Sequence, residues 1–186
     1  MYDFTGLAKL KTVQDIIDNV LENNMRLIIF CFHMTFITAI EDHLHKKAKF
    51  LYIGKNVDDN YKRGICDAFN TEEQYRAVLI DISEDISNIS FTTHNAVILF
   101  AEVFWNADII SKAEDCVKET GLKPSNNVIY VFGRYTLDEY IFKILYRQNP
   151  SLYQDLEPLQ VDLFSFRVNE NSFQNYDEMT SQTVFT

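Results

Sequence analysis

The hydrophobic residues of the first 150 positions follow two alternating patterns. Short unbroken apolar runs are typical of strands buried on both faces of a parallel sheet, and five occur, at residues 26–32, 50–53, 76–82, 96–101 and 127–132. Between these runs, apolar residues recur three and four positions apart, the spacing of a helix that packs one face on a core. This repeat predicts helices over residues 13–21, 36–44, 61–69 and 108–119 and a last helix that begins near residue 136.

The alternation of strands and helices predicts the fold class. Parallel strands joined by helices imply right-handed crossovers, with helices covering both faces of the sheet. We therefore expect residues 1–150 to form a three-layer α/β domain with a mostly parallel sheet of five or six strands. Residues 151–186 lose the periodicity and predict a C-terminal extension, and their six aromatic residues favour docking of at least part of it.

Two helix starts have candidate caps. Thr35 is placed to cap the second helix, and Thr136 to Glu139 form a capping box that opens the last one. Asp138 and Glu139 also resemble the acidic pair that holds Mg²⁺ in ATPases. Because they fall at a helix start and not at the end of a buried strand, we assign them to capping.

Composition and charge narrow the choice of function. The chain has 186 residues, the size of one domain, with 27 acidic and 17 basic side chains and a net charge of −10. A protein that holds phosphate backbones by charge has a basic surface, so we expect direct DNA or RNA binding to be weak or absent. A weak local patch could come from Lys46, Lys47 and Lys49. No apolar run is long enough to span a membrane, and three widely spaced cysteines favour an intracellular protein.

Motifs for phosphate or metal binding are missing. The five glycines, at positions 6, 54, 64, 121 and 133, form no phosphate-binding loop, and no metal site is predicted. Cys31 is interpreted as a core residue. His33 ends the first strand, where ligand contacts of parallel sheets gather, so it is a candidate contact residue, with a loop-stabilising role as the alternative.

The order of sequence blocks over residues 5–150 resembles a known family. Residues 97–106 read Val-Ile-Leu-Phe-Ala-Glu-Val-Phe-Trp-Asn and continue into Ala-Glu-Asp at 113–115, and residues 27–33 read Leu-Ile-Ile-Phe-Cys-Phe-His. These blocks are similar to the second RecA-like lobe of Swi/Snf-type superfamily 2 helicases, especially the HARP-like annealing helicases. The resemblance implies a RecA-like fold, and the nucleotide-loading first lobe is not among the matched blocks.

Departures from the family pattern affect the catalytic positions. The resemblance places two arginines that stabilise the transferring phosphate where this chain has Cys116 and Glu119, and Lys118 is a poor substitute. A small-residue stretch is replaced by acidic and polar residues 81–90. We expect no catalytic residue and no cofactor, with ATP relevant only if a first lobe is supplied, and a degenerate cleft lined by Ser83, Asn88, Ser90, Asp115 and Lys118.

Other positions are candidate contacts. The resemblance makes five residues candidates for nucleic-acid or interlobe contacts, with core packing or a solvated helix face as the alternative: His33, Lys62, Arg63, Trp105 and Asn106. In the extension, Gln160, Leu163 and Phe166 partly match a peptide that docks on DNA sliding clamps. Docking of the extension on its own domain is the alternative.

These observations predict a catalytically inactive helicase-lobe module. It would act through a protein partner in a nucleic-acid-associated assembly, and the resemblance implies the nucleus, with the cytoplasm as the alternative. A second hypothesis is an enzyme part, completed by a first lobe elsewhere, that supports ATP-driven strand annealing. A third is nucleic-acid binding without catalysis.

Overall fold

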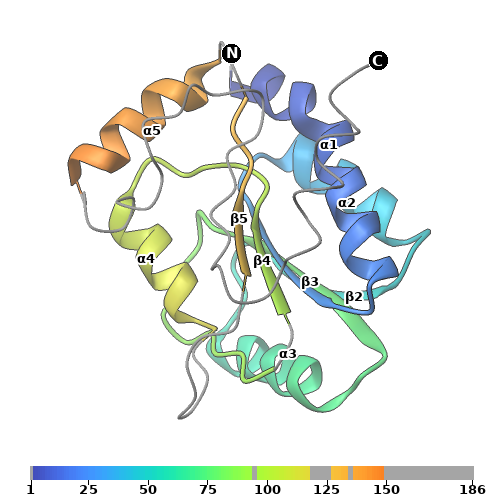
Figure 1. Ribbon diagram of the computed structural model, residues 1–186. Helices are drawn as coiled ribbons and strands as arrows, with labels where there is room; N and C mark the ends of the chain where they lie inside the picture. The colour runs from blue at the N-terminus through green and yellow to red at the C-terminus, as the bar shows by residue number, and fades with distance from the viewer. Residues whose placement is uncertain (1, 94–95, 118–126, 134–135, 149–186) are drawn as a thin grey trace.

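Five parallel strands form one sheet in the order β2-β3-β1-β4-β5. The structure is a computed structural model that describes residues 2–93, 96–117, 127–133 and 136–148. All four strand pairings are parallel, which confirms the predicted sheet (Figure 1). The strands are β1 (Arg26–Cys31), β2 (Lys49–Ile53), β3 (Tyr75–Asp81), β4 (Ala96–Phe100) and β5 (Asn127–Tyr130).

Helices cover both faces of the sheet, as predicted. One layer consists of α1 (Tyr2–Glu22) and α2 (Met34–Leu44), and the other of α3 (Asp59–Thr71), α4 (Ala107–Asp115) and α5 (Leu137–Gln148). Figure 1 shows α1 and α2 on one side of the strands and α4 and α5 on the other. The three-layer α/β architecture is therefore confirmed.

Strand side chains alternate between the two cores. Leu27 and Ile29 of β1 pack under α1 and α2, whereas Ile28 and Phe30 pack under the other layer. Burial on both faces explains the unbroken apolar runs of the sequence. On the α3–α5 side, the aligned rings of Phe30, Phe100 and Tyr130 stack with centroids 5.1 and 4.5 Å apart, and each such pair contributes about 0.5–1.5 kcal/mol beyond burial.

Several helix ends differ from the prediction. His33 is the N-cap residue of α2 and no side chain caps that helix, so the assignment of Thr35 as its cap was wrong. Asp58 caps α3 by accepting a hydrogen bond from the Tyr61 amide at 2.9 Å. α4 ends at Asp115, short of the predicted residue 119.

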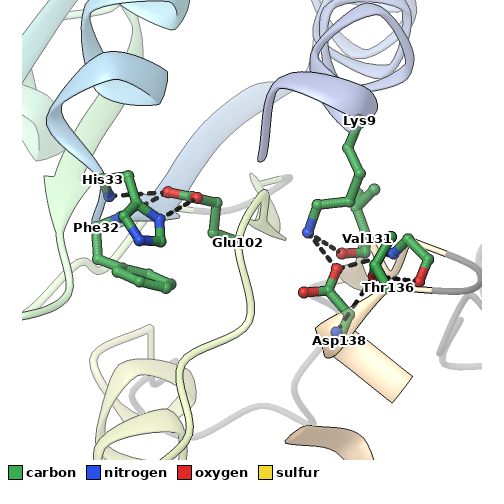
Figure 2. Close-up of polar contacts among 8 residues, drawn as sticks. Lys9, Phe32, His33, Glu102, Val131, Thr136 and Asp138 are labelled. Carbon is green, nitrogen blue, oxygen red and sulfur yellow. Dashed lines mark hydrogen bonds and ion pairs between the residues drawn. The ribbon is translucent and has the colours of Figure 1, made fainter. Parts of the chain in front are cut away.

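Asp138 has a different role from the predicted one. Its Oδ2 atom lies 2.7 Å from Lys9 Nζ and accepts a hydrogen bond from the Gly133 amide at 2.8 Å, in a site where both side chains are only 5% exposed. Lys9 also donates to the Val131 carbonyl at 2.9 Å (Figure 2). Thr136 Oγ1 does accept from the Asp138 amide, as a cap would. The Asp138 carboxylate, however, joins α1 to α5, which the capping interpretation missed.

Two further predictions concern the whole chain. Within the described residues, none of the helices combines the length and apolar character that a membrane crossing requires. The boundary at residue 150 and the extension over 151–186, with Gln160, Leu163 and Phe166, lie outside the described residues.

Candidate functional site

Glu102 joins two loops at the carboxyl end of the sheet. Its buried carboxylate follows β4, and Oε2 accepts hydrogen bonds from the Phe32 and His33 amides, both at 3.0 Å. The other oxygen, Oε1, lies 2.7 Å from His33 Nδ1 (Figure 2). The main-chain amides sit where α2 begins, so the carboxylate also meets the positive end of that helix. Glu102 therefore fixes the loop after β1 against the loop after β4.

An aromatic platform lies beside this anchor. It consists of Phe32, Phe104 and Trp105, whose ring centroids are 4.0 to 5.9 Å apart, and the His33 ring contacts Phe32 at 4.1 Å. Phe104 is buried, whereas Trp105 is 48% exposed. Trp105 is thus neither a core residue nor fully solvated, and it presents an aromatic face at the carboxyl edge of the sheet. The structure brings together two predicted contact residues, His33 and Trp105.

Asn106 has a structural role next to the platform. Its Oδ1 atom accepts hydrogen bonds from the Asp108 and Ile109 amides at 2.9 and 3.4 Å, and Asn106 is the N-cap of α4. The cap accounts for the asparagine at this position without any ligand.

The loop after β3 binds mainly to its own domain. Ser83 donates from both its amide and its hydroxyl to Asp81 Oδ1, at 3.0 and 2.6 Å. Asn88 Nδ2 donates to Asp59 Oδ2 at 2.9 Å, and the Ser90 carbonyl accepts from Asn70 Nδ2 at 3.3 Å. The three predicted cleft residues in this loop therefore all have partners within the protein.

One interpretation placed Lys62 on a solvated helix face, and the structure contradicts it. Its side chain is buried, and Nζ donates to the Asp85 carbonyl at 2.7 Å and lies 3.8 Å from Asp59 Oδ1. Arg63, its neighbour, is exposed and donates from Nε to the Asp59 carbonyl. Hydrogen bonds from Ser87 lower the pKa of Asp85, so this loop keeps a negative charge beside the lysine.

Cys116 packs in the core at the end of α4. The thiol donates to the Ala113 carbonyl at 2.9 Å, and burial raises the pKa of Cys116, with Cys66 nearby adding to the shift. The Cys116 carbonyl accepts from the Phe91 amide at 2.7 Å, which joins α4 to the loop after β3. A neutral, buried thiol therefore stands where the resemblance places a phosphate-facing arginine. Asp115 is exposed, and Lys118 and Glu119 lie outside the described residues.

The charges around the loop after β3 bear on nucleotide binding. Around the loop after β3, the described side chains include carboxylates and a buried thiol. Lys62 is held by Asp59 and Asp85, and the charge of Lys112 also acts on Asp85. A triphosphate needs cations or a cradle of amides at such a position. Within the described part of the chain, no three His, Cys, Asp or Glu side chains lie close enough together to hold a metal ion.

The candidate basic patch of Lys46, Lys47 and Lys49 also has partners within the protein. Lys47 Nζ donates to Asp18 Oδ2 and Lys49 Nζ to Gln74 Oε1, each at 2.8 Å. Two of its three lysines therefore already have acidic or polar partners.

Sequence analysis missed two residues at the carboxyl edge. Glu102 was part of a recognised string but was not considered as a contact, although a glutamate inside an apolar run is a usable signal. Asp81 is fully buried at the end of β3, and its only sequence signal was its place after an apolar run.

Comparison with known proteins identifies relatives. The chain is 27% identical over 147 residues, 77% of its length, to "SWI/SNF-related matrix-associated actin-dependent regulator of chromatin subfamily A-like protein 1" of Xenopus tropicalis. It is 26% identical over 150 residues, 80% of its length, to "DNA annealing helicase and endonuclease ZRANB3" of Homo sapiens. The chain is a homologue of these SWI/SNF-related annealing helicases. It spans only 14–15% of the length of these two relatives.

A solved structure supports the fold of this homologue. The crystal structure of the C-terminal part of the Fun30 ATPase domain superposes with a TM-score of 0.64 and 14% identity, covering 73% of this chain and 44% of that one. This similarity confirms the RecA-like fold predicted from the resemblance. No family model matches the chain. The homologue is thus related to a helicase or remodeller ATPase domain, and its own activity is a separate question.

Proposed function

We propose that the chain is a catalytically inactive RecA-like lobe that acts as a protein-binding or regulatory module in a nucleic-acid-associated assembly, in the nucleus. The single observation that carries the proposal is the environment of Cys116. An arginine finger contributes about 10³–10⁵ to the rate of phosphoryl transfer because its charge meets the phosphate. At this position the homologue has a thiol that is buried, neutral and turned into the core.

The loop after β3 supports the same proposal. Its polar groups are used in local hydrogen bonds, and its acidic residues Glu84 and Asp85 would repel phosphate. The net charge of −10 favours a protein partner over a nucleic acid. We expect direct DNA binding to stay weak at low salt.

Purified chain tests this proposal directly. Binding of a fluorescent ATP analogue and DNA-stimulated phosphate release would be measured on the chain alone and together with the N-terminal ATPase part of the Xenopus tropicalis relative. We expect no binding by the chain alone and no hydrolysis in the mixture. Hydrolysis that disappears in Lys118→Ala would contradict the inactive-module proposal.

Restoring the arginines gives a second test. Because the Cys116 side chain is in the core, Cys116→Arg should lower stability without restoring activity, and Cys116→Ser is the matched control for a polar change of similar size. A stable Cys116→Arg, Glu119→Arg variant that hydrolyses ATP with the added N-terminal part would overturn the proposal.

One observation favours the alternative, a second lobe completed by a first lobe elsewhere. Trp105 is half exposed at the carboxyl edge of the sheet, stacked on Phe104, where it offers an apolar surface to a first lobe. If the alternative is right, hydrolysis in the mixture should depend on Trp105 and fall in Trp105→Ala. Met34→Ala, a second exposed apolar residue, is the control.

A further inference from the structure

Asp81 has one carboxylate oxygen with partners and one without. Oδ1 accepts two hydrogen bonds from Ser83, at 3.0 and 2.6 Å. Oδ2 is completely buried and has no hydrogen-bond partner in the described part of the protein. Leaving a buried acceptor unsatisfied costs about 1–3 kcal/mol. The unsatisfied oxygen therefore indicates a donor that the described residues do not supply.

Other acceptors surround the end of β3. Tyr52 on β2 pairs with Leu79, so Tyr52 and Asp81 lie on the same face of neighbouring strands, under α2. The Glu84 amide donates to the Asp81 carbonyl at 3.2 Å, in a turn that folds Glu84 back toward the end of the strand. Burial, together with the charges of Asp81, Glu41 and Glu84, raises the pKa of Tyr52 to about 12. We call Glu41, Asp81 and Glu84, together with Tyr52, the carboxylate cluster.

The Tyr52 ring has a fixed place in this cluster. A Cβ atom built on Gly54 would lie 2.6 Å from Tyr52 Cε1, so only a glycine leaves room for the ring in this position. The hydroxyl is thereby held on the face of the sheet that Tyr52 shares with Asp81. It stays protonated at neutral pH and can act as a donor or an acceptor.

The chemistry of the cluster favours an organic cation. The charges that act on Tyr52 all raise its pKa, as acidic groups do. They are also too dispersed for a metal ion, because no group of three ligands in the described chain could hold one. A guanidinium group has five N–H donors spread over a rigid plane, so it can reach acceptors that are several ångströms apart.

We propose that Glu41, Asp81 and Glu84, with the Tyr52 hydroxyl, form a site for an arginine side chain of a partner protein. This inference depends on the proposed function as a protein-binding module. The turn that binds Oδ1 lies at the surface, since Ser83 is exposed and Glu84 partly exposed, so a shift of this turn would open the carboxylate to a planar group. The family that this chain resembles has small residues in the stretch that corresponds to residues 81–90, so the carboxylates of Asp81 and Glu84 are a property of this chain.

Titration of the full-length protein with capped tripeptides tests the site. Amide chemical shifts would be followed at physiological salt with Gly-Arg-Gly, Gly-Lys-Gly and Gly-Gln-Gly. We expect saturable shifts at Tyr52, Ser83 and Glu84 with the arginine peptide, weaker binding of the lysine peptide and none of the glutamine peptide. Asp81→Asn keeps the oxygen that caps Ser83 and should weaken binding of the arginine peptide at least tenfold.

Two further variants guard against a folding artefact. Glu84→Gln changes a partly exposed side chain and should weaken binding severalfold, whereas Asp67→Asn, an equal charge change on α3 at the other face, should leave it unchanged. The site is refuted by absence of saturable shifts, by equal shifts with the glutamine peptide, or by equal losses in Asp67→Asn and Asp81→Asn. Retention of a partner protein by Asp81→Asn would refute the site alone, whereas ATP hydrolysis by the chain would refute the proposed function.

Discussion

The buried ion pair between Lys9 and Asp138 should be a major determinant of stability. Lys9 Nζ and Asp138 Oδ2 are 2.7 Å apart, and at an effective dielectric constant near 20 two charges at this distance attract by about 6 kcal/mol. Desolvation of both groups offsets much of this attraction. Removing one partner instead leaves the other charge buried and unpaired, which costs about 3–5 kcal/mol.

Lys9→Met is the decisive change. It keeps the length of the side chain and removes the charge, so the free energy of unfolding should fall by about 3–5 kcal/mol, out of a typical total of about 5–15 kcal/mol. For a protein of this size, each kcal/mol lowers Tm by about 2–4 °C. Urea unfolding followed by far-UV circular dichroism would measure the loss. Lys11→Met, on the same helix in an exposed pair with Asp15, is the matched control and should have no measurable effect.

A double-mutant cycle separates the pair from its surroundings. Asp138→Asn retains an acceptor for the Gly133 amide, so Lys9→Met combined with Asp138→Asn should cost clearly less than the sum of the two single changes. Additive losses, or a loss below about 1 kcal/mol for Lys9→Met, would refute the argument that the two helices depend on this ion pair.

Four further changes have expected outcomes. Glu102→Ala should lower the free energy of unfolding by about 2–4 kcal/mol and speed amide exchange at the start of α2, while Glu102→Gln should do less; unchanged exchange would argue against the anchor. Asn106→Ala should cost about 0.5–2 kcal/mol in thermal unfolding, whereas Asn106→Asp, which preserves the cap, should cost little. Burial opposes it, but hydrogen bonds from Lys47 and His43 lower the pKa of Asp18, so the contribution of Asp18 to folding stability is present above the unfolded carboxyl pKa and is lost as pH falls through the lowered value. Urea midpoints between pH 5 and 2 should therefore fall more steeply in the wild type than in Asp18→Asn. Equal slopes would contradict this. The buried thiols, whose pKa values are raised by burial, should not react with a disulfide reagent until urea unfolds the chain, and fast labelling of Cys116 in the native state would place it outside the core.

Sequence periodicity predicted the strands and helices because burial on both faces of the sheet leaves a local signal. β4 is buried at all five positions, and its apolar run is visible without any knowledge of its neighbours. Helix ends were harder to predict. α2 has a backbone turn and a distant carboxylate at its start in place of a side-chain cap, so Thr35 offered a local signal that the fold does not use.

The site contacts depend on residues far apart in the chain. Lys9 and Asp138 are 129 positions apart, and His33 and Glu102 are 69 apart, so no local pattern marks either pair. Lys62 shares the buried face of α3 with Ile65 and Phe69, but its charge pointed to solvent, and only the structure shows that the loop after β3 folds over it. The family resemblance located the edge that these residues share, but only the packed sheet shows which of them are partners.

The Glu102 anchor separates the folding of the carboxyl edge from any chemistry performed there. Its oxygens are satisfied by groups of the protein itself, so the two loops keep their relative positions without a nucleotide to order them. Substitutions that remove phosphate-binding charges nearby then carry no folding penalty of their own. A lobe built in this way can drift away from ATP turnover over evolutionary time and still present the same rigid edge to selection for a new partner.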